Sequence, residues 1–315
     1  MPSLSLSRLS ATLILALGLA GAAAAHAATG TAAHAATAAA SAAQPAAAPL
    51  QVQVYHPDAN AIFGVASVLV SGARDAVLVD AQFSAADARA LVAQIRASGK
   101  RLTTIYVSHG DPDYYFGLDV LTQAFPQAKL LASPATVAHI RQTQAQKLQV
   151  WAPKLGADAP QRIVLPQPLH GDRLLLEGRE LQIVGLDGAT PDRTFVWIPS
   201  IKTVLGGIPV VAGEHVWMAD TQTPASHAQW LATLQRIQAL QPQRVIPGHF
   251  VPGAAQDLAA VRFTADYIRA FDEETAKAKD AAALVAAMQQ RYPQLGGVDT
   301  LQLSAKVAKG ELRWP

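Results

Sequence analysis

The segment Ser108-His109-Gly110-Asp111-Pro112-Asp113-Tyr114-Tyr115-Phe116-Gly117 follows directly on the apolar and β-rich run Leu102–Val107. Such a run is typical of a buried strand, and polar side chains at the carboxyl end of a buried strand mark the usual place of a site in an open α/β sheet. His109, Asp111 and Asp113 lie at alternating positions in this segment. The sequence therefore predicts a buried strand with a candidate site at its end.

The three polar side chains allow two interpretations. Alternate residues of an extended loop point to the same side, so the imidazole and the two carboxylates can converge on one divalent metal ion. Alternatively, Asp111-Pro112-Asp113 is a solvated turn that begins the next helix, and His109 forms a hydrogen bond with it. Spacing alone leaves both interpretations open.

A second loop has the same placement. Gly248-His249 follows directly on the predicted strand 244–247, again at a carboxyl end. A lone histidine after a strand is usually an ordinary loop residue, but two such loops favour one shared cleft. His249 is therefore a credible partner of the first loop.

The rest of the chain alternates strands and helices. In the first half we expect strands at 62–70, 76–80, 102–107 and 129–132, and helices at 84–98, 118–125 and 134–151. In the second half we expect strands at 174–176, 181–184, 194–198, 203–205 and 244–247, and helices at 226–240, 254–279 and 281–290. Strands followed by helices, twice over, predict two sheets packed between helices.

Three motifs together carry a resemblance to a known family. The order and spacing of Leu78-Val79-Asp80, of Ser108-His109-x-x-x-Asp113 and of Gly248-His249 resembles that of the metallo-β-lactamase superfamily, over about residues 52–252. Members have an αββα sandwich and usually bind one or two zinc ions through a His-x-His-x-Asp-His motif, a mid-chain His, a bridging Asp and a final His. The resemblance implies that His109 and Asp113 are ligands, that His249 is the final ligand, and that Asp80 orients the first loop.

The chain departs from that motif at four positions. Asp111 stands in place of the second His, Tyr114 in place of the third, Leu186 or Asp187 in place of the mid-chain His, and Ile208 in place of the bridging Asp. Losing these ligands would cost a dinuclear zinc centre most of its affinity. The sequence resembles most the little-characterised Vmh-like branch of the superfamily.

The retained residues leave room for a mononuclear site. The resemblance implies His109, Asp113 and His249 as ligands of one divalent metal, with zinc favoured and iron or manganese as alternatives, and with Asp111 or Asp187 as a further oxygen donor near the metal. The other alternative is that the chain binds no metal.

Two further side chains are candidates for catalysis beside Asp113. Tyr114 can stabilise an oxyanion, and His215 can act as an acid or as a replacement ligand. The alternative is structural: Tyr114 fills the space of an absent second metal, and His215 packs against the next helix.

The resemblance favours an enzyme, a metal-dependent hydrolase in which a metal-activated water attacks an ester, lactone or amide-like bond of a small-molecule substrate. The alternative is a non-catalytic protein of the same α/β fold, which binds a small molecule and has lost the metal. Ligand binding that a chelator leaves unchanged would distinguish this binding protein from the metal-dependent hydrolase.

The N-terminal region has the pattern of an export signal. Arg8 precedes the apolar stretch 11–25, and Ala25-His26-Ala27 offers a cleavage site, so we expect a signal peptide at 1–27 and an Ala-rich disordered linker at 28–49. The fold domain is expected at 50–253, with a helical extension at 254–315 packed on it. These features predict a bacterial periplasmic or secreted protein without an integral membrane segment after cleavage.

Composition narrows the chemistry. The chain has no cysteine, which excludes thiol nucleophiles, disulfides and thiolate metal sites. Residues 1–49 hold one of the 25 basic residues and none of the 23 acidic ones, so residues 50–315 carry 24 basic and 23 acidic residues. Without a basic stripe, nucleic acid is not an expected partner.

Overall fold

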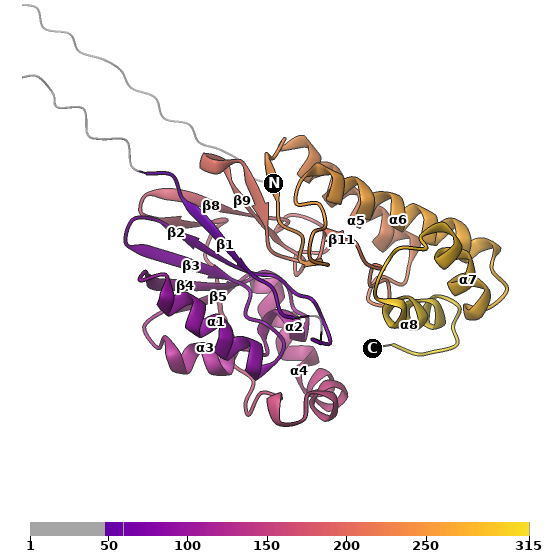
Figure 1. Cartoon of the computed structure of the whole chain (residues 1–315), viewed down its shortest axis with the longest axis horizontal. Helices are drawn as coiled ribbons and strands as arrows, with labels where there is room; N and C mark the ends of the chain where they lie inside the picture. Colours follow the sequence, from indigo (N-terminus) through magenta and orange to yellow (C-terminus); the bar gives the residue numbers. More distant parts are fainter. Residues whose placement is uncertain (1–47, 59, 315) are drawn as a thin grey trace, which may run out of the picture. The chain divides into compact units, whose positions relative to one another are not determined.

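A six-stranded sheet carries the N-terminal half of the chain in the order β1-β2-β3-β4-β5-β6 (Figure 1). Its strands are β1 (Gln51–Tyr55), β2 (Ser67–Ser71), β3 (Asp75–Val79), β4 (Arg101–Val107), β5 (Lys129–Ala132) and β6 (Gln167–Pro168). The pairs from β3 to β6 are parallel, so β3 and β4 end at the same edge of the sheet. The computed structural model describes residues 48–58 and 60–314.

A second sheet of five strands has the order β12-β10-β9-β8-β7. Its strands are β7 (Arg173–Leu176), β8 (Arg179–Val184), β9 (Phe195–Ile198), β10 (Thr203–Leu205) and β12 (Arg244–Val245). Two short strands, β11 (Val211–Ala212) and β13 (His249–Phe250), form a separate parallel pair. This pair holds His249 beside the turn that follows β10.

Helices cover both sheets. The helices are α1 (Ala85–Ala97), α2 (Pro112–Tyr115), α3 (Leu118–Ala124), α4 (Pro134–Leu155), α5 (Pro224–Ala239), α6 (Leu258–Lys277), α7 (Ala281–Arg291) and α8 (Val298–Ala308), with short 3-10 turns η1 (Gly156–Asp158) and η2 (Pro199–Ile201). In Figure 1, α1 and α3 lie along the first sheet, and α5 and α6 lie along the second. None of the described helices is both long enough and apolar enough to cross a membrane.

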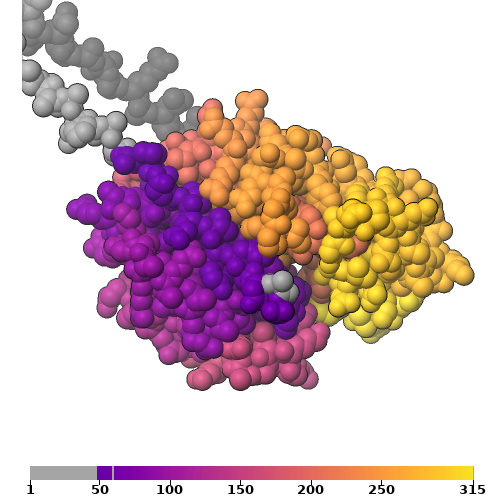
Figure 2. Space-filling model, in the orientation of Figure 1, coloured from indigo at the N-terminus to yellow at the C-terminus, as the bar shows by residue number. Residues whose placement is uncertain are grey.

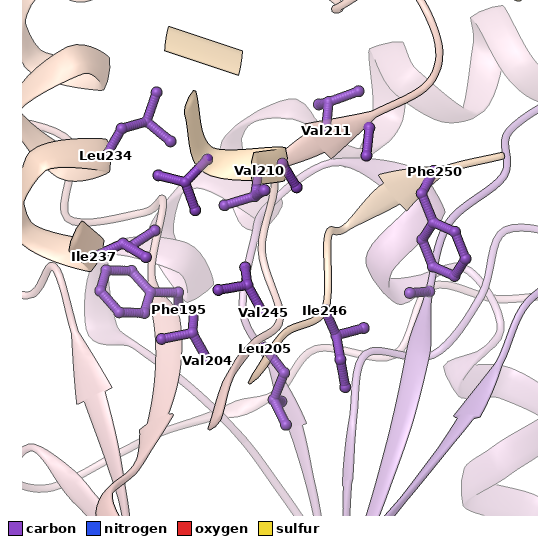
Figure 3. Close-up of a cluster of buried hydrophobic side chains, with 14 of the residues drawn as sticks. Phe195, Val204, Leu205, Val210, Val211, Leu234, Ile237, Val245, Ile246 and Phe250 are labelled. Carbon is purple, nitrogen blue, oxygen red and sulfur yellow. The ribbon is translucent and has the colours of Figure 1, made fainter. Parts of the chain in front are cut away.

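Strand alternation builds the core. Val68 and Val70 of β2 belong to the cluster shared with the second sheet, whereas Leu69 belongs to the cluster under α1. Successive side chains of a strand point to opposite faces, so a buried strand such as β2 supplies both clusters. Figure 3 shows the inner cluster where β9, β10 and α5 meet, with Phe195, Val204, Ile237 and their neighbours in contact. The two sheets thus face one another between layers of helices, an αββα sandwich.

Most elements lie where the sequence predicts them. The predicted αββα class is confirmed, and Ser84 caps α1 through its side chain as expected. The predicted strand at 62–70 begins only at Ser67, because the preceding residues form turns and an isolated bridge from Val65 to His249. Strand β1 and helix α8 were not predicted. The expected signal peptide (1–27) and linker residues 28–47 lie outside the described residues.

Candidate functional site

Asp80 anchors the first loop at the end of β3. Its buried carboxylate accepts hydrogen bonds from the Ser108 backbone N–H (2.8 Å) and from the Ser108 hydroxyl (2.8 and 2.7 Å to the two oxygens). The Gly207 N–H approaches the same carboxylate at 3.4 Å. Burial raises the pKa of Asp80 to about 7, against the opposing effect of these hydrogen bonds. Asp80 therefore joins β3, the loop after β4 and the turn after β10.

The first loop then begins a helix. Asp111 is the N-cap residue of α2 but makes no capping hydrogen bond with its side chain. Instead, its Oδ2 lies 2.9 Å from His109 Nε2, and its Oδ1 lies 3.1 Å from Lys147 Nζ. Burial alone raises the pKa of Asp111, but His109 and Lys147 outweigh it and hold that pKa well below its usual range. The Asp111 carboxylate is thus fixed between two cationic groups.

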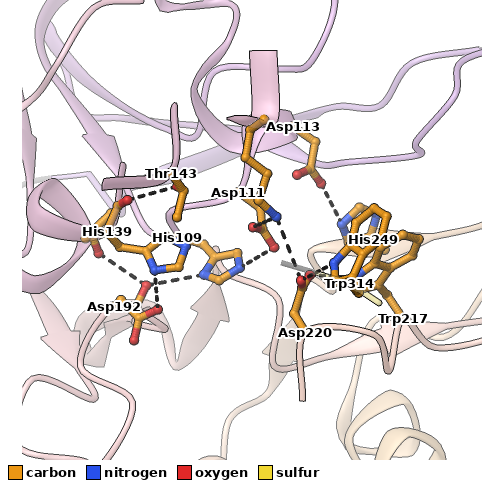
Figure 4. Close-up of polar contacts among 12 residues, drawn as sticks. His109, Asp111, Asp113, His139, Thr143, Asp192, Trp217, Asp220, His249 and Trp314 are labelled. Carbon is orange, nitrogen blue, oxygen red and sulfur yellow. Dashed lines mark hydrogen bonds and ion pairs between the residues drawn. The ribbon is translucent and has the colours of Figure 1, made fainter. Parts of the chain in front are cut away.

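Lys147 extends this network to a second carboxylate, that of Asp220. Figure 4 shows Asp111, Asp220 and the indoles of Trp217 and Trp314 in one group. Lys147 Nζ lies 3.8 Å from Asp220 Oδ1, and the lysine side chain is only 8% exposed. Asp220 also accepts hydrogen bonds from two indoles, those of Trp217 (2.5 Å) and Trp314 (2.7 Å). Burial raises the pKa of Asp220, and Asp111 raises it further, while Lys147 opposes both. The ammonium is therefore held between the buried carboxylate of Asp111 and the partly buried one of Asp220.

Asp113 and His249 form a separate pair. Asp113 Oδ2 lies 3.0 Å from His249 Nε2, and the other ring nitrogen, Nδ1, lies 4.0 Å from Glu214 Oε1. Burial lowers the pKa of His249, but the hydrogen bond with Asp113 and the nearby carboxylates outweigh it, so the pKa is raised overall. His249 is therefore an imidazolium between two carboxylates over a wider pH range than a free histidine.

Tyr114 lies between the two histidines. Its ring meets those of His109 and His249 edge-on, with ring centroids 5.1 and 5.8 Å apart. Its hydroxyl is buried and has no hydrogen-bond partner within residues 48–58 and 60–314. Ile208 belongs to the same apolar cluster. The space between His109 and His249 is thus filled by side chains.

A cleft opens beside these groups. It holds about 730 Å³ of space when the open solvent at its mouth is included. Its lining combines charged and aromatic side chains: Asp111, Asp113, Lys147, Glu214, His215, Asp220 and His249, with Phe63, Trp151, Trp217 and Trp314. Gly297 and Thr300, next to and within α8, close one side. Figure 2 shows a hollow between the indigo N-terminal part and the yellow C-terminal helices.

Residues 61–249, more than half of the 315-residue chain, match the family profile described as the metallo-beta-lactamase superfamily. The chain belongs to the metallo-β-lactamase superfamily. This membership supports a hydrolase-type fold and agrees with the αββα architecture. A search among curated proteins gives no match.

Solved structures of this superfamily share the fold at low sequence identity. A metallo-beta-lactamase family protein from Thermus thermophilus matches with a TM-score of 0.59 and 17% identity over 82% of this chain and 91% of its own. A beta-lactamase domain protein from Burkholderia ambifaria matches with a TM-score of 0.56 and 17% identity, over 85% of this chain and 88% of its own. A metallo-beta-lactamase from Pontibacter korlensis matches with a TM-score of 0.52 and 17% identity, over 70% of this chain and 95% of its own. These likenesses concern the fold alone.

Members of the superfamily usually bind divalent metals such as zinc, but the side chains present here do not fit a shared ion. No group of three His, Asp or Glu side chains among the described residues could hold a metal. The four expected ligands instead form two pairs, His109 with Asp111 and Asp113 with His249, separated by the Tyr114 ring. Lys147 adds a positive charge 3.1 Å from Asp111, which repels a metal ion at that carboxylate.

Two more candidates of the sequence lie apart from these pairs. Asp187 is 73% exposed and pairs with Arg236 at 2.7 Å on the surface, so it is not among the cleft residues. His215 does line the cleft and is only 2% exposed. Its Nδ1 lies 2.9 Å from the Tyr267 hydroxyl, and its Nε2 has no partner in the described part of the chain. Burial lowers the pKa of His215.

Four side chains of the cleft were not predicted from the sequence: Lys147, Glu214, Asp220 and Trp314. For Lys147 a signal exists, because it shares the buried face of α4 with Ile140 and Trp151, seven residues before it and four after. A lysine at a position where helical spacing demands an apolar residue indicates a buried ion pair. Trp314 carried no such signal, since only tertiary packing brings the C-terminal segment to the cleft.

Proposed function

We propose that this protein binds a small organic molecule in the cleft and does so without a metal ion shared by His109, Asp113 and His249. The observation that carries the proposal is the placement of Lys147, whose ammonium lies between Asp111 and Asp220 as a fixed positive charge. The aromatic side chains of the lining offer apolar contact area, and its charged side chains can orient a ligand. Small-molecule sites usually combine these two kinds of contact.

The positive charge of Lys147 is well compensated, which supports a structural role for it in the cleft. Buried ammonium groups are stable when they are paired and hydrogen-bonded. Burial lowers the pKa of Lys147, but Asp111 and Asp220 outweigh it and raise the pKa overall. Its charge is therefore permanent at neutral pH, in the place where a metal ion would compete for the same carboxylate.

Metal analysis of protein purified without a His-tag tests this proposal, together with thermal unfolding in the presence of zinc, iron or manganese. We expect substoichiometric metal and no rise in Tm. Small aromatic molecules should bind with equal affinity with and without a chelator, as measured by quenching of tryptophan fluorescence. Stoichiometric metal that is lost in His109→Ala, with a metal-dependent rise in Tm, would sink the proposal.

A second candidate function is hydrolysis of an ester, lactone or amide-like bond, which a hydrolase-type fold supports. The observation in its favour is that imidazole and carboxylate face the cleft together at Asp113 and His249, 3.0 Å apart. Turnover of p-nitrophenyl acetate, a lactone or nitrocefin would favour it, provided that Asp113→Asn abolishes the turnover. Sensitivity to a chelator would assign zinc, iron or manganese to that activity.

We also propose that the protein is exported to the bacterial periplasm or medium. The support is the pattern of Arg8, the apolar stretch 11–25 and the Ala25-His26-Ala27 motif. Cell fractionation with N-terminal sequencing of the mature chain tests it, and a chain that keeps residues 1–27 in the cytoplasm would contradict it.

A further inference from the structure

Glu214 is a carboxylate on the cleft wall without a hydrogen-bond donor for its side chain in the described residues. Its nearest basic group is His249, with Nδ1 4.0 Å from Oε1, beyond hydrogen-bond distance. The His249 charge is already engaged by Asp113, at 3.0 Å from the other ring nitrogen. Glu214 therefore has weaker charge compensation than Asp111 or Asp113.

The other carboxylates of the cleft already have basic partners. Lys147 lies beside Asp111 and Asp220, and His109 and His249 pair with Asp111 and Asp113. Burial raises the pKa of Glu214, which shows that its charge is only partly compensated. A ligand cation would supply the partner that the described residues do not give to Glu214.

Aromatic rings lie beside the same carboxylate. The Phe63 ring meets the His249 ring edge-on at 6.4 Å between centroids and the Trp217 ring at 6.0 Å. Glu214, His249, Phe63 and Trp217 are thus neighbours in one part of the cleft. A carboxylate together with aromatic rings is the arrangement that binds amines and quaternary ammonium groups, because the ring faces attract cations.

An unpartnered buried atom next to Glu214 independently indicates a ligand. His215 lines the cleft and is 2% exposed, yet its Nε2 has no hydrogen-bond partner within residues 48–58 and 60–314. Buried polar atoms are normally satisfied, so an orphaned one beside a cavity is explained by a partner that is not part of the protein chain. When Nδ1 donates to the Tyr267 hydroxyl, Nε2 is an acceptor, and the N–H of a ligand ammonium group would satisfy it.

We propose that the cleft selects an organic cation, a protonated amine with an apolar group, whose charge pairs with Glu214 beside the rings of Phe63 and Trp217. This inference rests on the proposed function, because it names the ligand class of the same cleft. Lys147 does not oppose it, since its charge is matched by Asp111 and Asp220.

Isothermal titration with three probes of one shape tests the inference: benzylamine, benzyl alcohol and benzoate. We expect benzylamine to bind about tenfold more tightly than benzyl alcohol, and benzoate more weakly than both. Glu214→Gln keeps the size of the side chain and removes its charge, so the affinities for benzylamine and benzyl alcohol should become equal. Thermal unfolding with the Tm of the wild type shows that the variant is folded.

Asp187→Asn is the matched control, because it also removes one carboxylate but on the surface, where Asp187 pairs with Arg236. It should keep the preference for benzylamine. Benzyl alcohol or benzoate binding as tightly as benzylamine, or an undiminished preference in Glu214→Gln, overturns this inference and leaves the proposed function standing. Failure of all three probes to bind overturns both.

Discussion

Lys147 Nζ lies 3.1 Å from Asp111 Oδ1, and both side chains are almost fully buried, at 8% and 11% exposure. This contact joins the middle of α4 to the first residue of the loop-to-helix turn after β4, 36 positions earlier in the chain. It gives the cleft a positive charge supplied by the protein itself.

Lys147→Met should destabilise the fold by about 3 kcal/mol, because it leaves the carboxylates of Asp111 and Asp220 with less compensation while keeping the length of the side chain. Urea unfolding measures the loss. The same variant should also gain a zinc-dependent rise in Tm that the wild type lacks, since Asp111 and Asp220 lose their competing cation.

Lys154→Met is the control for this experiment. Lys154 lies in the same helix, and its Nζ is 4.5 Å from the centroid of the Trp151 ring, but its side chain is exposed. Its replacement should cost at most about 1 kcal/mol and give no response to zinc. Equal losses in the two variants would contradict a special role for Lys147.

Tyr114→Phe should leave stability unchanged or raise it by about 1 kcal/mol, because it removes a buried hydroxyl that has no partner in the described part of the chain. Tyr106→Phe is the matched comparison: the Tyr106 hydroxyl lies 2.9 Å from Thr194 Oγ1, and its removal should cost about 1 kcal/mol. Thermal and urea unfolding of both variants measure the contrast. A large loss in Tyr114→Phe would mean that this hydroxyl has a partner.

Stability should fall as the pH rises above about 6.5, the ordinary pKa of histidine. The Asp113 contact raises the pKa of His249 against the opposing effect of burial, so the folded state holds the proton more tightly than the unfolded state. Such a group contributes stability below its unfolded pKa, and this contribution is lost as the pH rises through the folded pKa.

Urea unfolding between about pH 5.5 and 9 checks this dependence on protonation of His249. His249→Gln should flatten the decline, although not completely, because the pKa of His109 is raised in the same way by Asp111 against burial. His170→Gln, at an exposed position, should leave the pH profile unchanged. An identical slope in wild type and His249→Gln would rule out this origin.

Trp314→Phe should weaken the binding of aromatic probes and cost about 1.5 kcal/mol of stability, because Asp220 loses a charge-assisted hydrogen bond from the indole. Trp230→Phe is the control, since its indole donates to the Pro209 carbonyl oxygen (2.8 Å) and Trp230 does not line the cleft. This control should lose stability but not affinity. Fluorescence titration with benzyl alcohol separates the two effects.

The sequence by itself determined the fold and the place of the cleft. Strand runs ending at Asp80, His109 and Gly248-His249 put polar side chains at carboxyl ends, and parallel strands bring such ends together at one edge. Local signals of this kind, such as the Ser84 cap of α1, depend on neighbours within a few residues. They can therefore be recognised in the sequence alone.

Only the tertiary structure decided how the side chains at that edge are paired. Lys147 and Trp314 reach Asp111 and Asp220 from distant parts of the chain, and the Tyr114 ring separates His109 from His249. Burial and charge pairing depend on which groups meet in three dimensions, and motif spacing does not contain this information. The sequence motifs predicted where the cleft lies. Only the packing of α4 against the loop after β4 places the ammonium of Lys147 beside Asp111 in that cleft.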